Sequence, residues 1–112
     1  MTLDYRRLED RQGALGTPPF GPAARVQAGF LLRRLQRGDR LSMPDSRPMP
    51  SIGRRCHELR IDDDNVAWRI IYRTDADAIV IAEVFAKKTD RTSQPVIEVC
   101  RRRLREYDHA CK

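Results

Sequence analysis

Three short runs rich in β-forming residues lie between residues 56 and 88, and they constrain the fold more than any other feature of this chain. The runs 56–61 and 66–73 alternate apolar and polar residues, whereas 78–86 is apolar almost throughout. Turns built from Asp, Asn and Thr separate the runs. Because consecutive strands joined by short turns pair antiparallel, this stretch predicts an antiparallel meander whose last strand is covered on both faces.

Two amphipathic segments flank these strands and predict helices. Residues 22–37 begin with Pro22, which suits the first position of a helix, and stop before Gly38, which suits the end of one. Residues 95–107 place apolar side chains at helical spacing over a back of arginines. The stripes expected to face the core are Val26, Phe30, Leu31 and Leu35 in the first helix, and Val96, Ile97, Cys100, Leu104 and Tyr107 in the second.

These patterns predict an α+β fold, in which a small antiparallel sheet has the helices, including a C-terminal one, packed on its apolar side and leaves a polar side open. The Pro-rich connection 38–55 excludes a regular helix and could wrap one edge of the sheet. Residues 1–18 are charged and lack a period, so we expect a weakly ordered arm there. A single domain is expected over residues 19–112.

The charge of the chain favours a polyanionic partner. Its formal net charge is +6, and 19 of its 22 basic residues are Arg, whose planar fork suits phosphate better than the point charge of Lys. A GC-rich genome would raise the arginine count as well, so this second explanation of the count stays open. The positions of the arginines therefore matter more than their number.

Cysteine usage and hydropathy indicate the compartment. Three cysteines without CxxC spacing, in a chain with no apolar leader, predict reduced thiols and a cytoplasmic protein. No apolar run reaches the roughly 20 residues that a membrane span needs. Residues 62–64 are acidic but fit a hairpin turn, and no phosphate-binding loop is present, so neither a metal ion nor a cofactor is expected.

Period-two geometry gathers charge on the polar side of the sheet. The residues gathered there are Glu58, Arg60, Arg69, Arg73, Lys87 and Lys88. We expect a cross-strand pair between Glu58 and an arginine, with positive charge left over. A rigid positive groove of this kind suits a phosphodiester backbone.

Cleavage of RNA without a metal ion needs a base for the 2′-hydroxyl, a proton donor for the leaving oxygen and cations for the phosphorane. The arginines could supply the cations. Histidine suits acid–base work near neutral pH, but alternation turns His57 to the apolar side with Leu59. A positive field lowers the pKa of a lysine, so Lys87 and Lys88 are candidate bases, with plain attraction of RNA as the simpler role.

Three segments resemble one known family. RPMPSIGRRCHELRI (47–61), WRIIYR (68–73) and VFAKKTDRT (84–92), followed by a basic terminal helix, are similar to the RelE/ParE toxin superfamily, and closest to its HigB-like, phage-derived branch. The resemblance covers about residues 18–108. It implies a metal-independent endoribonuclease that cuts mRNA on the ribosome and leaves a cyclic phosphate and a 5′-hydroxyl. It also implies a cognate antitoxin, often of the helix-turn-helix type.

The resemblance assigns candidate site residues by their motifs. The implied catalytic residues are Arg60 of ELRI, Arg69 of WRIIY, and Lys87 and Lys88 of the KKT segment. The residues expected to contact RNA around them are Arg54, His57, Arg73 and Arg91, and Arg73 is supported by the geometry of the sheet more than by the family pattern. Family members usually begin with a strand, for which residues 1–17 show no pattern. Two alternatives stay open: a ParE-like inhibitor of DNA gyrase, and an inactive toxin fold kept for binding.

Overall fold

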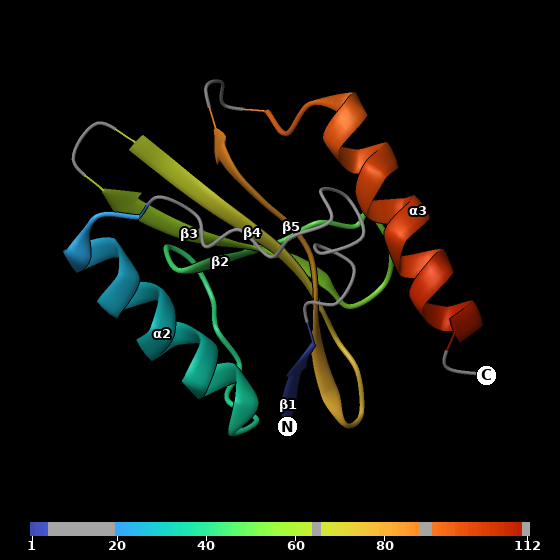
Figure 1. Cartoon of the computed structure of the whole chain (residues 1–112), viewed down its shortest axis with the longest axis horizontal. Coiled ribbons are helices and arrows are strands. Elements are labelled where there is room, and N and C mark those ends of the chain that lie inside the picture. The colour runs from blue at the N-terminus through green and yellow to red at the C-terminus, as the bar shows by residue number, and fades with distance from the viewer. Residues whose placement is uncertain (5–19, 64–65, 88–90, 111–112) are drawn as a thin grey trace.

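The computed structural model describes residues 1–4, 20–63, 66–87 and 91–110, and the chain is α+β, as predicted (Figure 1). The predicted helices and the three predicted strands are present with bounds close to those expected from the sequence. Its elements are β1 (Thr2–Asp4), α2 (Pro22–Gln36), β2 (Ser46–Pro48), β3 (Cys56–Asp63), β4 (Val66–Thr74), β5 (Ala78–Lys87) and α3 (Gln94–Ala110).

The five strands form one sheet in the order β1-β5-β4-β3-β2. The sheet is mixed rather than purely antiparallel, because β1 pairs parallel with the start of β5, with Leu3 opposite Ile79. Three residues are too few to show an alternating pattern, so β1 was not expected within the N-terminal arm. Residues 5–19, which include the rest of that arm, lie outside the described residues. The Pro-rich connection does reach an edge of the sheet, where β2 pairs with β3.

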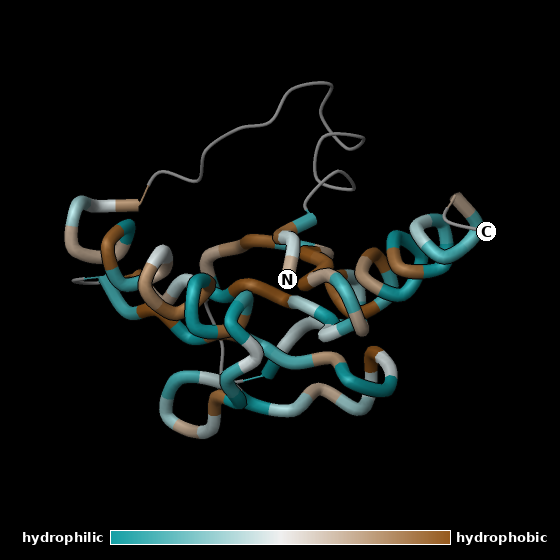
Figure 2. Tube along the Cα trace, turned by 90° about the horizontal axis from the view of Figure 1, so that it is seen from below, coloured by the Kyte–Doolittle hydropathy of each residue, from teal (hydrophilic) through white to brown (hydrophobic). Residues whose placement is uncertain are grey.

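The expectation that both helices share one side of the sheet is wrong, because α2 and α3 cover opposite faces (Figure 1). Ile79 and Ile81 of β5 pack with α2, and Val80 and Ala82 pack with α3. We call these the α2 face and the α3 face. Figure 2 shows the apolar strands between the two helices. The unbroken apolar run of β5 carried this information, since a strand covered on both faces needs a layer on each.

Helix α2 packs through a different stripe from the one expected. Ala24 and Ala28 are buried with Leu31 and Leu35, whereas the side chains of Val26 and Phe30 are 70% and 54% exposed. The two small alanines let the helix approach the sheet closely. In the described part of the chain, no helix is long and apolar enough to cross a membrane.

A β-bulge divides β5 and decides which face its second half presents. Ile71 pairs with Glu83 but the next residue, Tyr72, pairs with Ile81, so Ala82 is the extra residue. The Ala82 carbonyl accepts a hydrogen bond from Arg103 Nη1 at 2.6 Å. Beyond the bulge the alternation is reversed, so Glu83 and Lys87 face α3 although Ile79 and Ile81 face α2.

Candidate functional site

A buried carboxylate stands at the centre of the charged part of the α3 face. Glu58 on β3 is 0% exposed, and its Oε1 lies 3.2 Å from Arg47 Nη2 and 3.8 Å from Arg69 Nε. Lys87 Nζ lies 3.5 Å from the same oxygen, and Thr92 Oγ1 donates to Oε2 at 2.8 Å. The expected Glu58–Arg pair is therefore present. We call Arg47, Glu58, Arg69, Lys87 and Thr92 the Glu58 cluster.

The Glu58 cluster has more positive than negative charge. Three cations meet one buried carboxylate. Asp62 adds a contact of 3.4 Å to Arg69 Nη1, but its side chain is 81% exposed, so water and salt weaken that contact. The Nε atoms of Arg47 and Arg69 are buried without a hydrogen-bond partner among the described residues. The surplus charge favours an anion at this surface.

Arg60 lies beside the cluster on the same strand as Glu58. It stands directly opposite Arg69 in the β3–β4 register, and its side chain is partly exposed. No hydrogen bond or ion pair of the Arg60 guanidinium occurs within the described segments. Like charges opposite each other on adjacent strands are unfavourable for folding, and a bound anion would relieve that cost.

Lys87 reaches the cluster because the bulge turns it there. Its side chain is only 6% exposed. Burial lowers the pKa of Lys87 below that of an ordinary lysine, and the neighbouring Glu58 carboxylate opposes part of that change. At a given pH more of this amine is neutral than in an exposed lysine, so it is better suited to accept a proton.

Arg73 lies on the α3 face too, but it is paired with carboxylates. Its Nε and Nη2 donate to Asp75 at 2.7 and 2.9 Å, and its Nη1 and Nη2 donate to Asp108 of α3 at 3.1 and 2.6 Å. These contacts raise the pKa of Arg73 further above its ordinary value, the bond to Asp75 most of all. Arg73, Asp75 and Asp108, which we call the Arg73 tie, join β4 to α3.

The other expected site residues lie elsewhere. His57 is on the α2 face, as alternation predicted, with Nδ1 at 3.3 Å from the Arg55 carbonyl oxygen and its ring stacked on Tyr72. Arg54 and Arg91 are exposed in the segments before β3 and after β5. Lys88 lies outside the described residues. The structure thus brings Arg60, Arg69 and Lys87 together and leaves Arg73 and His57 apart from them.

Two members of the Glu58 cluster were missed in the sequence. Arg47 lies in a Pro-rich connection with no strand pattern, and only the pairing of Arg47 with Glu58 between β2 and β3 brings it to the face. Thr92 is 34 residues from its partner. Nothing in the sequence near either residue predicts its contact with Glu58. Among the residues that the structure describes, no three His, Cys, Asp or Glu side chains are grouped so that they could hold a metal ion.

Comparison with protein-family models gives a match for this chain. Residues 19–105 match the model of a family described as "Phage derived protein Gp49-like (DUF891)", which is of the RelE-like toxin type. No curated protein matches the chain. A family of this type is consistent with the toxin of a toxin–antitoxin system and implies an antitoxin partner. The match spans most of the chain, which therefore belongs to the Gp49-like family of phage-derived, RelE-like proteins.

Proposed function

We propose that this protein is the HigB-like toxin of a type II toxin–antitoxin system, and that it cleaves mRNA on the ribosome without a metal ion. The observation that carries the proposal is the surplus of cations on the α3 face. Arg60 has no carboxylate partner among the described residues, and it adjoins a cluster in which three cations share Glu58. An RNA backbone supplies the negative charge that this surface lacks.

Exposed and buried cations of this face would have different roles in RNA cleavage. Arg47 and Arg60 are partly exposed, so they would contact the scissile phosphate and stabilise the phosphorane as charge builds on it. Arg69 lies deeper, and its guanidinium is fixed by a 2.8 Å bond to the Trp68 carbonyl oxygen. It would add positive field and would contribute little direct contact.

Lys87 is the proposed base. Its neutral amine would accept the proton of the 2′-hydroxyl as the O2′–P bond forms. The P–O5′ bond would break, and the 5′-oxygen would take up a proton from water, which gives a 2′,3′-cyclic phosphate and a 5′-hydroxyl. A positioned base contributes about 10²–10⁴-fold to such a step. Glu58 holds the amine within 3.5 Å, and burial keeps the pKa of Lys87 low.

The implied partner is an antitoxin, which we propose to be a helix-turn-helix protein. It would neutralise the toxin by covering or distorting the α3 face. Binding of the partner is testable apart from cleavage, since a folded but inactive toxin would still bind it. The sharpest variant for that purpose is Arg60→Ala, because this side chain has no structural partner in the described segments.

Brief induction of the chain in a bacterial host, with mapping of mRNA 5′ ends, tests the proposal. The wild type is expected to stop growth and to create new 5′-hydroxyl ends in translated mRNA. Arg60→Ala should relieve both effects, and Arg105→Ala, an exposed arginine of α3, should relieve neither. Arrest with intact mRNA and lost DNA supercoiling would favour the gyrase alternative. Tight antitoxin binding without arrest would favour the inactive one.

A further inference from the structure

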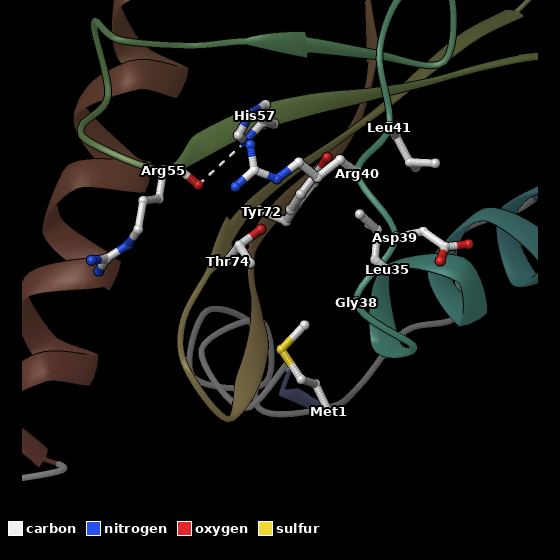
Figure 3. Close-up of a pocket in the computed structure, with 10 residues that line it drawn as sticks. All are labelled: Met1, Leu35, Gly38, Asp39, Arg40, Leu41, Arg55, His57, Tyr72 and Thr74. Atoms are coloured by element: carbon white, nitrogen blue, oxygen red, sulfur yellow. Dashed lines mark hydrogen bonds between the residues drawn. The ribbon is translucent and has the colours of Figure 1, made fainter.

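A pocket of about 410 Å³ lies on the α2 face (Figure 3). The Glu58 cluster lies on the opposite face of the sheet. It opens between the end of α2, the connection that follows, and the neighbouring ends of β3 and β4. Its lining residues are Met1, Leu35, Gly38, Asp39, Arg40, Leu41, Arg55, His57, Tyr72 and Thr74. The volume lies within the range of about 300–1,000 Å³ that small-molecule sites occupy.

Two stacked aromatic rings form one wall of this pocket. The His57 and Tyr72 rings lie 5.4 Å apart between centroids at an interplanar angle of 17°. Tyr72 is buried, and its hydroxyl lies 2.7 Å from Ser46 Oγ, so this hydrogen bond fixes the Tyr72 ring. His57 is only partly buried. A planar base can therefore extend the stack on the His57 ring, as bases do on aromatic side chains in single-strand sites.

The backbone holds the His57 ring in one orientation. Its Nδ1 is 3.3 Å from the Arg55 carbonyl oxygen, and a carbonyl only accepts, so Nδ1 donates and Nε2 is left for a ligand. The same oxygen also accepts from the Thr74 amide at 3.1 Å. Arg55 has a φ of 62°, a left-handed conformation that is uncommon outside glycine. Such backbone strain is typical of functional sites, where it helps to orient a side chain.

Among the side-chain cations that line the pocket, Arg40 has no carboxylate partner in the described residues, and the N-terminal ammonium of Met1 donates to the Gln36 carbonyl oxygen. Figure 3 shows the Arg40 guanidinium extended across the pocket toward His57. The carboxylate of Asp39 points away, and it is paired with Arg34 and Arg37, each at 3.3 Å. Arg55 also points away, and its Nη2 lies 3.5 Å from Asp75. Within the described segments the Arg40 guanidinium is therefore the unpaired one at this site, and a guanidinium suits phosphate.

We propose that this pocket binds a nucleotide, with the base stacked on His57 between Leu35 and Leu41 and the phosphate bound by Arg40 and the Thr74 hydroxyl. The ligand is a free mononucleotide or a nucleotide within an RNA strand, since both have the same base and phosphate. The proposal does not depend on cleavage of RNA, because the Glu58 cluster lies on the other face of the sheet.

Isothermal titration of the full chain with 5′-mononucleotides, ribose 5-phosphate and an uncleavable 2′-O-methyl trinucleotide tests the site. Mononucleotides should bind, and Arg40→Gln should weaken them about tenfold. His57→Leu should weaken them by roughly tenfold and leave ribose 5-phosphate unchanged, because it removes only the stack. His57→Phe keeps a ring and should keep binding. Arg25→Gln, an exposed arginine at the other end of α2, is the matched control and should change nothing.

The trinucleotide arm identifies the source of the ligand. Affinity far above that of the mononucleotide, reduced by both Arg40→Gln and Arg60→Gln, supports a site for an RNA strand that crosses both faces. Equal affinities that Arg60→Gln leaves unchanged support a site for a free nucleotide. The proposal is overturned if no mononucleotide binds at millimolar concentration, if Arg25→Gln weakens binding as much as Arg40→Gln, or if ribose 5-phosphate binds as tightly as the nucleotides.

Discussion

The α3 face carries two groups of arginines that look alike in the sequence and differ in their balance of charge. In the Arg73 tie Arg73 meets two carboxylates through four hydrogen bonds, and Arg55 lies 3.5 Å from one of them, Asp75. In the Glu58 cluster three cations share one carboxylate, and Arg60 stands beside them. The first group satisfies itself and fastens a helix. The second group leaves positive charge that a bound anion could neutralise. The number of carboxylates near the arginines, more than the number of arginines, therefore distinguishes a structural tie from a binding site.

Loss of Arg73 should destabilise the fold, because the Arg73 tie joins β4 to α3. Arg73→Gln removes charged bonds to Asp75 and Asp108 and should lower the free energy of unfolding by about 3 kcal/mol, measured by urea denaturation. Arg102→Gln is the control, because its pair with Glu106 at 3.6 Å is exposed and contributes under about 1 kcal/mol. Equal stability of the two variants would show that Arg73 does not hold α3 to the sheet.

The next effect breaks the unbalanced group. Arg60→Ala should slow RNA cleavage about 100-fold, or about 2.7 kcal/mol of transition-state stabilisation, because it removes a phosphate contact. Its free energy of unfolding should stay within about 0.5 kcal/mol of the wild type, since the cation has no partner to lose in the described segments. A well-folded Arg60→Ala protein that cleaves at the wild-type rate would remove Arg60 from the site.

The proposed base Lys87 should make the cleavage rate depend on pH. Its neutral fraction rises roughly tenfold per pH unit below its pKa, so cleavage should rise with pH and level off below the pKa of an ordinary lysine. Lys87→Met should lose this rise and most of the activity. An identical pH profile in the variant would assign the proton to another group.

The same shift has a consequence for stability. The pKa of Lys87 is lower in the folded than in the unfolded chain, so between those two values the unfolded chain binds the extra proton. Stability therefore rises with pH through that window, by the contribution of this one group. Denaturation of the wild type and Lys87→Met at several alkaline pH values should show a smaller rise in the variant.

Binding of a small anion should distinguish the Glu58 cluster from the Arg73 tie. Sulfate at about four times its dissociation constant should stabilise the wild type by about 1 kcal/mol, seen as a higher melting temperature. Arg60→Ala should lose most of this gain, and Arg73→Gln should retain it although its starting stability is lower. The reverse pattern would mean that the tie, and not the cluster, is the anion-binding group.

Much of the architecture could be predicted because periodicity reports it. The bounds of β3, β4, β5 and both helices follow from their patterns, and His57 was placed on the correct face. The face of α2 was misread, because Leu31 and Leu35 fit a stripe with Val26 and Phe30 as well as one with Ala24 and Ala28. Periodicity cannot choose between those stripes, since the choice depends on how closely the helix approaches the sheet.

The charge partners could not be predicted, because they are distant in the chain. Arg73 meets Asp108 across 35 residues, and Glu58 meets Thr92 across 34. Arg69 and Arg73 are both predicted to point to the same face of the sheet. Arg69 nevertheless lies in the Glu58 cluster, and Arg73 lies in the Arg73 tie. Their difference depends on where α3 and the segment after β5 are placed, which is a property of the tertiary structure.

The bulge at Ala82 has a consequence for changes in chain length. Inserting or deleting one residue between Glu83 and Lys87 would turn the lysine to the α2 face and away from Glu58. Removing Ala82 itself would straighten the strand and leave both halves facing as before, at the loss of the acceptor for Arg103. Relatives in which this strand is one residue longer or shorter are therefore expected to differ at the bulge. A change there leaves each side chain of the strand on the same face of the sheet.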